Sequence, residues 1–148
     1  MDRTTRGFLA GIIAGAVMNA WNLIDYYFLH ITEIRFLDWF SILTSWAKPE
    51  NIFEAIIALI FQTVLWDGFL GVVFAHLIFL ITSKGVVYKS VVYSLLCWFF
   101  FKVMVNFYHV PLLSGKQSLS GRLSNIMAAI LWGIIMGLTL RKLDKSVL

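Results

Sequence analysis

Residues 7–30 read GFLAGIIAGAVMNAWNLIDYYFLH, and this stretch decides the class of the fold. Among its 24 residues, Asp25 is the single Asp, Glu, Lys or Arg. A helix of roughly 20 mainly apolar residues crosses the hydrocarbon core of a bilayer. The basic residues Arg3 and Arg6 before the stretch are also a feature of signal peptides. Because the apolar run continues past Tyr26 without a small-x-small cleavage site, the sequence predicts a helix that is retained in the membrane.

The composition of the whole chain supports the same conclusion. Of its 148 residues, 60% are apolar and 14% are charged, whereas a soluble domain has about 25% charged residues. Aromatic residues make up 16% of the chain and include six tryptophans, as in proteins anchored at membrane interfaces. The net charge of +4 is spread over the predicted helix ends, which favours a role in topology over nucleic-acid binding. The single cysteine, Cys97, excludes an intrachain disulfide and a cysteine-rich metal site, and its apolar neighbours predict an inert thiol.

Four segments are long enough to span a bilayer, namely residues 7–30, 52–82, 86–110 and 123–140. The second segment is longer than a bilayer requires, so it must tilt, project beyond the membrane, or break near Gly68 and Gly71. Residues 31–51 combine charged and aromatic side chains, as an amphipathic segment at the membrane surface does. We therefore predict an all-α integral membrane protein, with four transmembrane helices in one domain over residues 1–148 and an interfacial segment after the first helix.

The distribution of lysine and arginine predicts the direction of the spans. Seven of the 12 basic residues lie at the N-terminus, around the second loop and at the C-terminus, and four lie in the first and third loops. Cytoplasmic loops carry the excess of basic residues. The sequence therefore predicts a multi-pass protein of the cell membrane with both termini in the cytoplasm.

Small residues recur at every fourth position of the first span. Gly7, Gly11 and Gly15 share one helix face, and in lipid such a face lets a second helix backbone approach closely. Shorter versions occur in the second and fourth spans, at Gly68, Gly71, Gly133 and Gly137. The sequence leaves two partners open for these faces: another helix of the same chain, or a second copy of the protein.

Polar side chains interrupt all four spans. Counted at about 1.5 Å per residue from the cytoplasmic ends, Lys102, Asp67 and Asn125 lie roughly 23–27 Å into the membrane. A charge at the bilayer centre costs about 2.5–3.5 kcal/mol and usually has a partner, so we expect Asp67 or Asp25 to neutralise Lys102. The predicted intramembrane polar cluster comprises Asn19, Asn22, Asp25, Asp67, Lys102, Asn106 and Asn125.

Three interpretations of this cluster remain open at the level of sequence. The cluster is a buried clasp that fixes the register of the helices, or it faces the outer side and contacts a substrate, an ion or a proton. In the third interpretation, Lys102 directs its ammonium outward while its stem lies on lipid.

Few residues fit a cofactor or a catalytic centre. His30 and His109 fall at matching outer ends of the first and third spans and are the candidates for a metal or haem site, although interfacial histidines are more often solvated. A Ser-Gly-basic pattern occurs twice within residues 114–122, where a lipid phosphate could bind, but the motif is weak and a polar turn is the favoured interpretation. The chain contains no GxSxG, HExxH, paired CxxC or Gly-rich dinucleotide motif. We predict no enzyme, no cofactor and no metal.

Residues 25–34, DYYFLHITEI, resemble the end of the first helix in YqhR-type proteins, which are small membrane proteins of Gram-positive, spore-forming bacteria. A basic residue before a glycine-rich first helix and the stretch LWGIIMG at 131–137 are similar too. The resemblance covers the two ends of the chain better than its middle. It implies a multi-helix bacterial membrane protein with no assigned activity, so it brings no catalytic residues to this chain.

These features predict a non-enzymatic protein of a bacterial cytoplasmic membrane. The first candidate function is packing or assembly, in which the polar cluster specifies the fold and the choice of partner, either a second copy or another membrane protein. The alternative is a small transporter or channel subunit whose polar cluster touches its cargo. A lipid- or haem-binding membrane protein is a third candidate. The lipid bilayer is a predicted partner in every case, and nucleic acid is not.

Overall fold

The computed structural model describes residues 1–81 and 84–145, and every regular element in this part of the chain is a helix. Four continuous helical segments in this part of the chain are long and apolar enough to cross a membrane. Two short π-helical turns, in which hydrogen bonds join residues five apart, continue the helices before them. The elements in chain order are α1 (Arg3–Ile24), η1 (Asp25–Leu29), α2 (Phe36–Ser45), α3 (Ile52–Phe61), η2 (Gln62–Asp67), α4 (Gly68–Ile81), α5 (Val86–Phe107) and α6 (Leu119–Lys145).

Side-chain caps explain where two of the helices begin. The Asp2 carboxylate accepts a hydrogen bond from the backbone N–H of Thr5 (3.0 Å), so α1 begins before residue 7, where the sequence placed its start. The Asn51 side chain accepts one from the backbone N–H of Glu54 (2.9 Å), and α3 begins where predicted. The third span ends before residue 110 and the fourth is longer at both ends than predicted. The predicted end of the second span, residue 82, lies outside the described residues.

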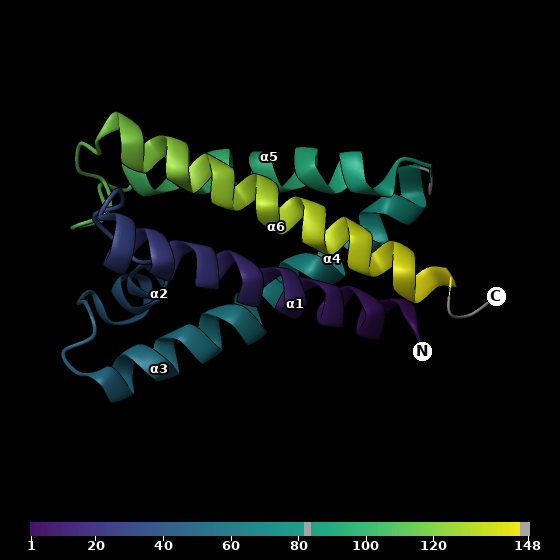
Figure 1. The fold of residues 1–148 in the computed structure, drawn as a ribbon, viewed down its shortest axis with the longest axis horizontal. Coiled ribbons are helices and arrows are strands. Elements are labelled where there is room, and N and C mark those ends of the chain that lie inside the picture. The colour runs from purple at the N-terminus through teal and green to yellow at the C-terminus, as the bar shows by residue number, and fades with distance from the viewer. Residues whose placement is uncertain (82–83, 146–148) are drawn as a thin grey trace.

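The second span follows a path that the sequence left open. α3, η2 and α4 succeed one another without a loop, so the helix does not break at Gly68 or Gly71. The irregular part is the π-helical turn η2 that ends immediately before Gly68. α4 packs against α1, whereas in Figure 1 α3 diverges from α1 towards the end of the bundle opposite the termini.

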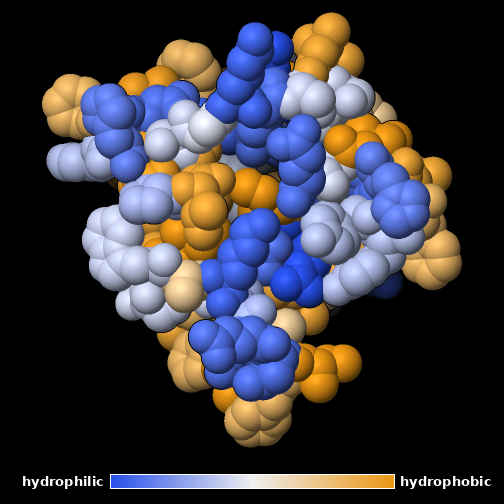
Figure 2. All heavy atoms as spheres, turned by 90° about the vertical axis from the view of Figure 1, so that its left-hand side faces the viewer, coloured by the Kyte–Doolittle hydropathy of each residue, from blue (hydrophilic) through white to orange (hydrophobic). Residues whose placement is uncertain are grey.

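The polar and apolar surfaces are separated as a bilayer requires. α1 begins and α6 ends at the same end of the bundle (Figure 1), where an ion pair joins Arg6 to Asp144. At the opposite end, hydrophilic side chains cover much of the face and apolar ones gather around its edge (Figure 2). Exposed leucine, isoleucine, valine and phenylalanine side chains lie along the spans. The protein is therefore a multi-pass integral membrane protein in contact with the lipid bilayer.

The small-residue face of α1 packs against the second span of the same chain. A Cβ atom added to Gly7 would lie 2.7 Å from the Cβ of Ala75, and one added to Gly11 would lie 2.1 Å from the carbonyl oxygen of Asp67. From the other side, a Cβ on Gly71 would lie 2.3 Å from the carbonyl oxygen of Gly7. These distances are too short for any Cβ, so glycine alone allows the two backbones to meet here.

α5 and α6 form a second close pair, in which serine hydroxyl groups take part. Ser90 Oγ donates a hydrogen bond to the carbonyl oxygen of Gly133 (2.6 Å), and Ser94 Oγ donates one to that of Ala129 (2.8 Å). A Cβ on Gly137 would lie 2.3 Å from Ser90 Oγ. Serine–glycine contacts of this kind combine close packing with interhelical hydrogen bonds, which is how membrane helices associate without a hydrophobic driving force.

The segment after the first span contains the amphipathic helix α2, whose apolar face packs on protein. Leu37, Trp39 and Ile42 are at most 7% exposed. Trp39 and Ile42 belong to one apolar cluster with Val105 at the end of α5 and Leu113 in the loop that follows it. α2 thus covers the end of the bundle opposite the termini.

Candidate functional site

A partly enclosed cavity of about 320 Å³ lies between the two close helix pairs. α2 walls it at the end opposite the termini, η2 and α4 wall one side, and α5 and α6 wall another. Leu70 lines it too, and its carbonyl oxygen accepts a hydrogen bond from the hydroxyl of Tyr93 (3.1 Å), whose ring packs on Phe74 (centroids 5.1 Å apart). The wall is mainly aromatic and includes Phe36, Trp39, Trp66, Trp98, Phe101 and Trp132.

The cavity opens beside α2 and η2. Leu43 and Thr44 of α2 and Trp66 of η2 line the cavity and are also exposed at the surface of the protein. The Phe40 and Phe61 rings stack nearby with centroids 6.2 Å apart and join α2 to α3. Because the exposed side chains around the opening are largely apolar, a molecule would reach the cavity from the lipid side of the bundle.

Three polar side chains that line the cavity carry buried oxygen atoms without hydrogen-bond partners. They are Gln62 Oε1, Asp67 Oδ2 and Asn125 Oδ1, on side chains that are 6%, 2% and 4% exposed. The indole N–H groups of Trp98 and Trp132, which belong to the same wall, are also unpaired within the described residues. Buried polar groups are normally hydrogen-bonded, so this group of atoms makes the cavity the candidate functional site.

The π-helical turn η2 explains why Gln62 and Asp67 reach the same cavity. Residues five apart lie on nearly opposite sides of a helix with 3.6 residues per turn. In a π-helical turn the hydrogen bonds join residues five apart, which brings such residues towards the same side. Gln62 and Asp67 are the first and last residues of η2, and both line the cavity.

Gly15 gives the Asp67 carboxylate its space. A Cβ added to Gly15 would lie 2.3 Å from Asp67 Oδ2 and 2.7 Å from its Cβ. The third glycine of the α1 strip therefore meets the Asp67 side chain, whereas Gly11 meets backbone atoms of Asp67 and Gly68. The absence of a side chain at position 15 sets where this carboxylate lies.

The polar residues of the first span connect it to three different elements. Asn19 donates a hydrogen bond from Nδ2 to Thr63 Oγ1 in η2 (3.0 Å). Asp25, which is fully buried, accepts one from Ser124 Oγ in α6. The Asn22 side chain accepts a hydrogen bond from the first residue of α2. These contacts are those of a clasp that holds together the half of the bundle farther from the termini.

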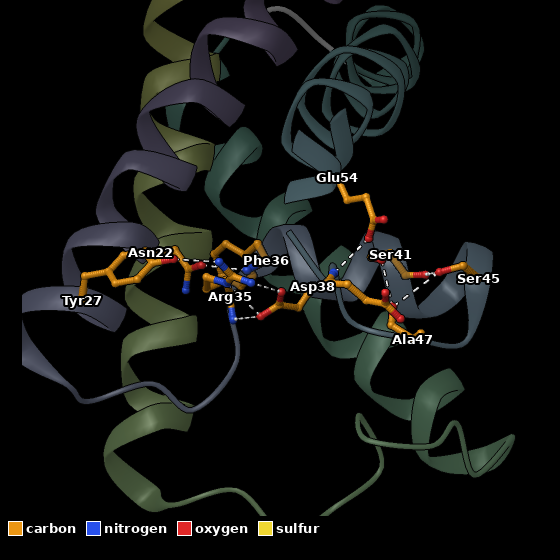
Figure 3. A network of polar contacts seen from close by, with 10 residues as sticks. Asn22, Tyr27, Arg35, Phe36, Asp38, Ser41, Ser45, Ala47 and Glu54 are labelled. Atoms are coloured by element: carbon orange, nitrogen blue, oxygen red, sulfur yellow. Dashed lines mark hydrogen bonds and ion pairs between the residues drawn. The ribbon is translucent and has the colours of Figure 1, made fainter. Parts of the chain in front are cut away.

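Arg35 organises the start of α2, as Figure 3 shows. Its guanidinium donates to both oxygens of Asp38, from Nε to Oδ2 (3.1 Å) and from Nη2 to Oδ1 (2.7 Å), and its Nη1 donates to the Tyr27 hydroxyl (2.7 Å). The hydrogen bonds with Asp38 are the main reason why the pKa of Arg35 lies above its ordinary value. Asn22 Oδ1 accepts from the backbone N–H of Phe36 (2.7 Å) and so ties this helix start to α1.

The structure divides the predicted polar cluster into separate groups. Asn19, Asn22 and Asp25 form the clasp on α1, while Asp67 and Asn125 line the cavity. Asn106 is exposed on α5 and takes part in neither group.

Lys102 has partners other than the carboxylates that the sequence suggested. Its Nζ donates to Gln117 Oε1 (2.8 Å) in the loop between α5 and α6, and it lies 4.5 Å from the centroid of the Trp39 ring. No ion pair to Asp67 or Asp25 is found in the described part of the chain. The prediction of a buried ion pair is therefore wrong. The long stem of Lys102 instead carries the ammonium to the loop at the end of the bundle.

The histidines lie apart from these polar groups. His30 and His109 are exposed and adopt left-handed backbone conformations (φ 53° and 50°) where the first and third spans end. His76 is exposed, and its Nδ1 lies 2.9 Å from the carbonyl oxygen of Val72. Among the described residues, no group of three or more His, Cys, Asp or Glu side chains is placed to hold a metal ion.

Several residues of the site were not identified from the sequence. Gln62, Ser94 and the four tryptophans of the wall belong to the cavity, and Thr63, Ser124 and Gln117 are the partners of predicted residues. A signal existed for Gln62, because a glutamine within an otherwise apolar span is uncommon unless it is paired or functional. Tryptophan gave no comparable signal, since it is also common at membrane interfaces.

The fold and the site define a four-span integral membrane protein with a cavity inside its helices and polar groups buried between them. Comparisons with protein-family models, with curated proteins and with solved structures find no match to this chain.

Proposed function

We propose that this protein binds a small amphipathic molecule within the membrane, as the binding component of a small transporter. The observation that carries this proposal is the cavity with three unpaired buried oxygen atoms, on Gln62, Asp67 and Asn125. A mainly apolar cavity with a few polar atoms is the usual form of a small-molecule site. Unpaired polar atoms are costly in an apolar environment, and a ligand that bonds to them offsets this cost.

A role in assembly alone has less support from the same geometry. A clasp that only fixes helix register is expected to pair its polar groups within the chain, as the side chains of Asn19 and Asn22 do. The glycine faces that could receive a partner subunit are occupied by helices of the same chain. Both observations favour a binding protein that does not need a second copy to complete its site.

The proposal includes an orientation and a location. The positive-inside distribution of lysine and arginine supports cytoplasmic termini, and the cavity then opens in the outer half of the membrane. The resemblance of residues 25–34 to YqhR-type proteins supports a bacterial cytoplasmic membrane. We propose no chemical reaction, so the protein is a non-enzymatic binding component.

Cys97 provides a direct test, because it lines the cavity and is the single cysteine of the chain. The protein in lipid nanodiscs is treated with methyl methanethiosulfonate, a small thiol-specific reagent, and labelling is followed by mass spectrometry of the intact chain. Octylamine, octanol and octanoate are added as probes. We expect at least one of them to slow the labelling of Cys97 with a saturable dependence on concentration.

Two variants with the same substitution serve as a matched control. Ala129→Phe adds a ring at the cavity wall, and Ala20→Phe adds the same ring at an exposed position of α1. Ala129→Phe should slow the labelling of Cys97 and abolish protection by the probe, whereas Ala20→Phe should change neither. If no probe protects Cys97 and both variants are labelled at the rate of the unmodified chain, the binding function is wrong.

A further inference from the structure

We infer that the molecule this cavity takes is a hydrophobic amine in its ammonium form, held by the Asp67 carboxylate with its apolar part against the aromatic wall. The inference rests on the proposed function and names the chemical class of the ligand. Gln62 and Asn125 would orient the ammonium, since both line the same cavity as Asp67.

The unpaired atoms of the polar side chains select a hydrogen-bond donor. Gln62 Oε1, Asp67 Oδ2 and Asn125 Oδ1 are all oxygen atoms that accept hydrogen bonds. An ammonium group carries N–H donors and no acceptor, so it complements such a set, whereas a carboxylate or a phosphate only accepts. The unpaired indole N–H groups of Trp98 and Trp132 suit a hydroxyl or carbonyl oxygen elsewhere on the amine.

The charge of the cavity selects a cation. Among the described residues that line it, Asp67 alone has a side chain that is normally charged at neutral pH, and no basic side chain forms an ion pair with it. A buried carboxylate requires an opposite charge or a proton. Asp25 is equally buried and its Oδ1 is also unpaired, but its Oδ2 accepts a hydrogen bond from Ser124 and the residue does not line the cavity. Asp38, the third buried acid of the described residues, is paired with Arg35, so Asp67 is the one that a ligand in the cavity can reach.

The aromatic wall favours the same ligand. Cations are attracted to the faces of aromatic rings, and most strongly to tryptophan. The protein already uses one of these rings in this way, because Lys102 Nζ lies 4.5 Å from the centroid of the Trp39 ring. The wall continues around the cavity with Trp66, Trp98 and Trp132. An ammonium at Asp67 and an alkyl or aryl body against these rings would match the polar and the apolar parts of the cavity.

The test compares three octyl compounds by protection of Cys97 at neutral pH in phosphatidylcholine nanodiscs, with concentrations corrected for partition into nanodiscs without protein. Octylamine should protect at a concentration at least about tenfold below that of octanol, the difference expected for one hydrogen bond to a charged group. Octyltrimethylammonium, which has the charge but no N–H donor, should fall between them.

Nanodiscs that contain phosphatidylethanolamine and no added amine show whether a lipid headgroup is the source of the ammonium, because only then would the lipid itself protect Cys97.

Two carboxylate variants locate the effect within the structure. Asp67→Asn should remove the preference for octylamine over octanol. Asp25→Asn, the matched change at a buried acid outside the cavity, should keep the preference. Thermal unfolding of each variant in the same nanodiscs identifies any that does not fold.

The wild-type chain alone can overturn the inference, so the test does not depend on the folding of a variant. Equal protection by octylamine and octanol would show that the ligand is not an amine, while the binding function would stand. Retention of the octylamine preference by folded Asp67→Asn would likewise remove Asp67 from the site. Protection by none of the compounds would instead contradict the binding function itself.

Discussion

Arg35 and Asp38 show how single side chains place a whole helix. Asp38 is 1% exposed and accepts hydrogen bonds from the guanidinium and from the backbone N–H of Arg35 (3.0 Å for the latter). The pKa of Arg35 is raised, chiefly by its hydrogen bonds with Asp38. A raised pKa means that the stability from this pair is complete below the unfolded-state pKa and is lost only as pH rises through the folded-state value. The pair therefore contributes a constant amount throughout the neutral range.

Arg35→Met should lower the free energy of unfolding by about 3 kcal/mol, because it leaves a buried carboxylate without its partner. Arg35→Lys keeps the charge but cannot bond both carboxylate oxygens as a planar guanidinium does, so its effect should be intermediate. Unfolding by sodium dodecyl sulfate in mixed micelles measures both changes, with the exposed Glu33→Gln as a neutral control. A loss below about 1 kcal/mol, the value of an exposed ion pair, would contradict this account.

Lys102 and Asp67 should act independently of each other. Since Lys102 bonds to Gln117 and contacts the Trp39 ring, the unfolding free-energy changes of Lys102→Met and Asp67→Asn should add to within about 0.5 kcal/mol. The pair Lys102→Met and Gln117→Leu shares a hydrogen bond and should not be additive. A double variant of Lys102 and Asp67 that is clearly milder than the sum would show that the two charges pair in solution.

At the scale of helices, the close approach of α1 to the second span depends on single glycines. Gly11→Ala should lower the free energy of unfolding by about 1–3 kcal/mol, the cost of forcing extra atoms into a packed contact, because its Cβ would lie 2.1 Å from the carbonyl oxygen of Asp67. Gly115→Ala is the control, since a Cβ there has no heavy atom within 4 Å, and it should stay within about 0.5 kcal/mol of the unmodified chain. Equal stability of the two variants would show that α1 does not pack on α4 in the membrane.

At the scale of the whole molecule, the arrangement of the spans predicts the compartment of each end. α1 begins and α6 ends at one end of the bundle (Figure 1), and the loop between α5 and α6 lies at the other. A reporter that is active only in the cytoplasm should therefore be active when fused after residue 148 and inactive when inserted at residues 114–116. Activity in the loop and not at the C-terminus would reverse the orientation, and activity at both sites would contradict the four-span arrangement.

The sequence by itself determined that this chain is a four-span helical membrane protein. Each span must satisfy its backbone hydrogen bonds internally and present apolar side chains to lipid. The length and composition of one stretch of sequence are therefore enough to identify a span. The spacing of Gly7, Gly11 and Gly15 likewise marked the face that meets α4, because that part of α1 is a regular helix. The spans and this packing face are properties of one continuous stretch of chain.

Only the tertiary structure decided how the buried polar residues are grouped. Spacing assigns residues to a helix face only while the helix is regular, and the π-helical turn η2 brings Gln62 and Asp67 to a common cavity that regular spacing does not predict. Depth along a span also did not identify the partner of Lys102, because its flexible stem lets the ammonium reach Gln117 in a loop. Partners of long side chains depend on which segments meet in space, and this information is absent from the local pattern of the sequence.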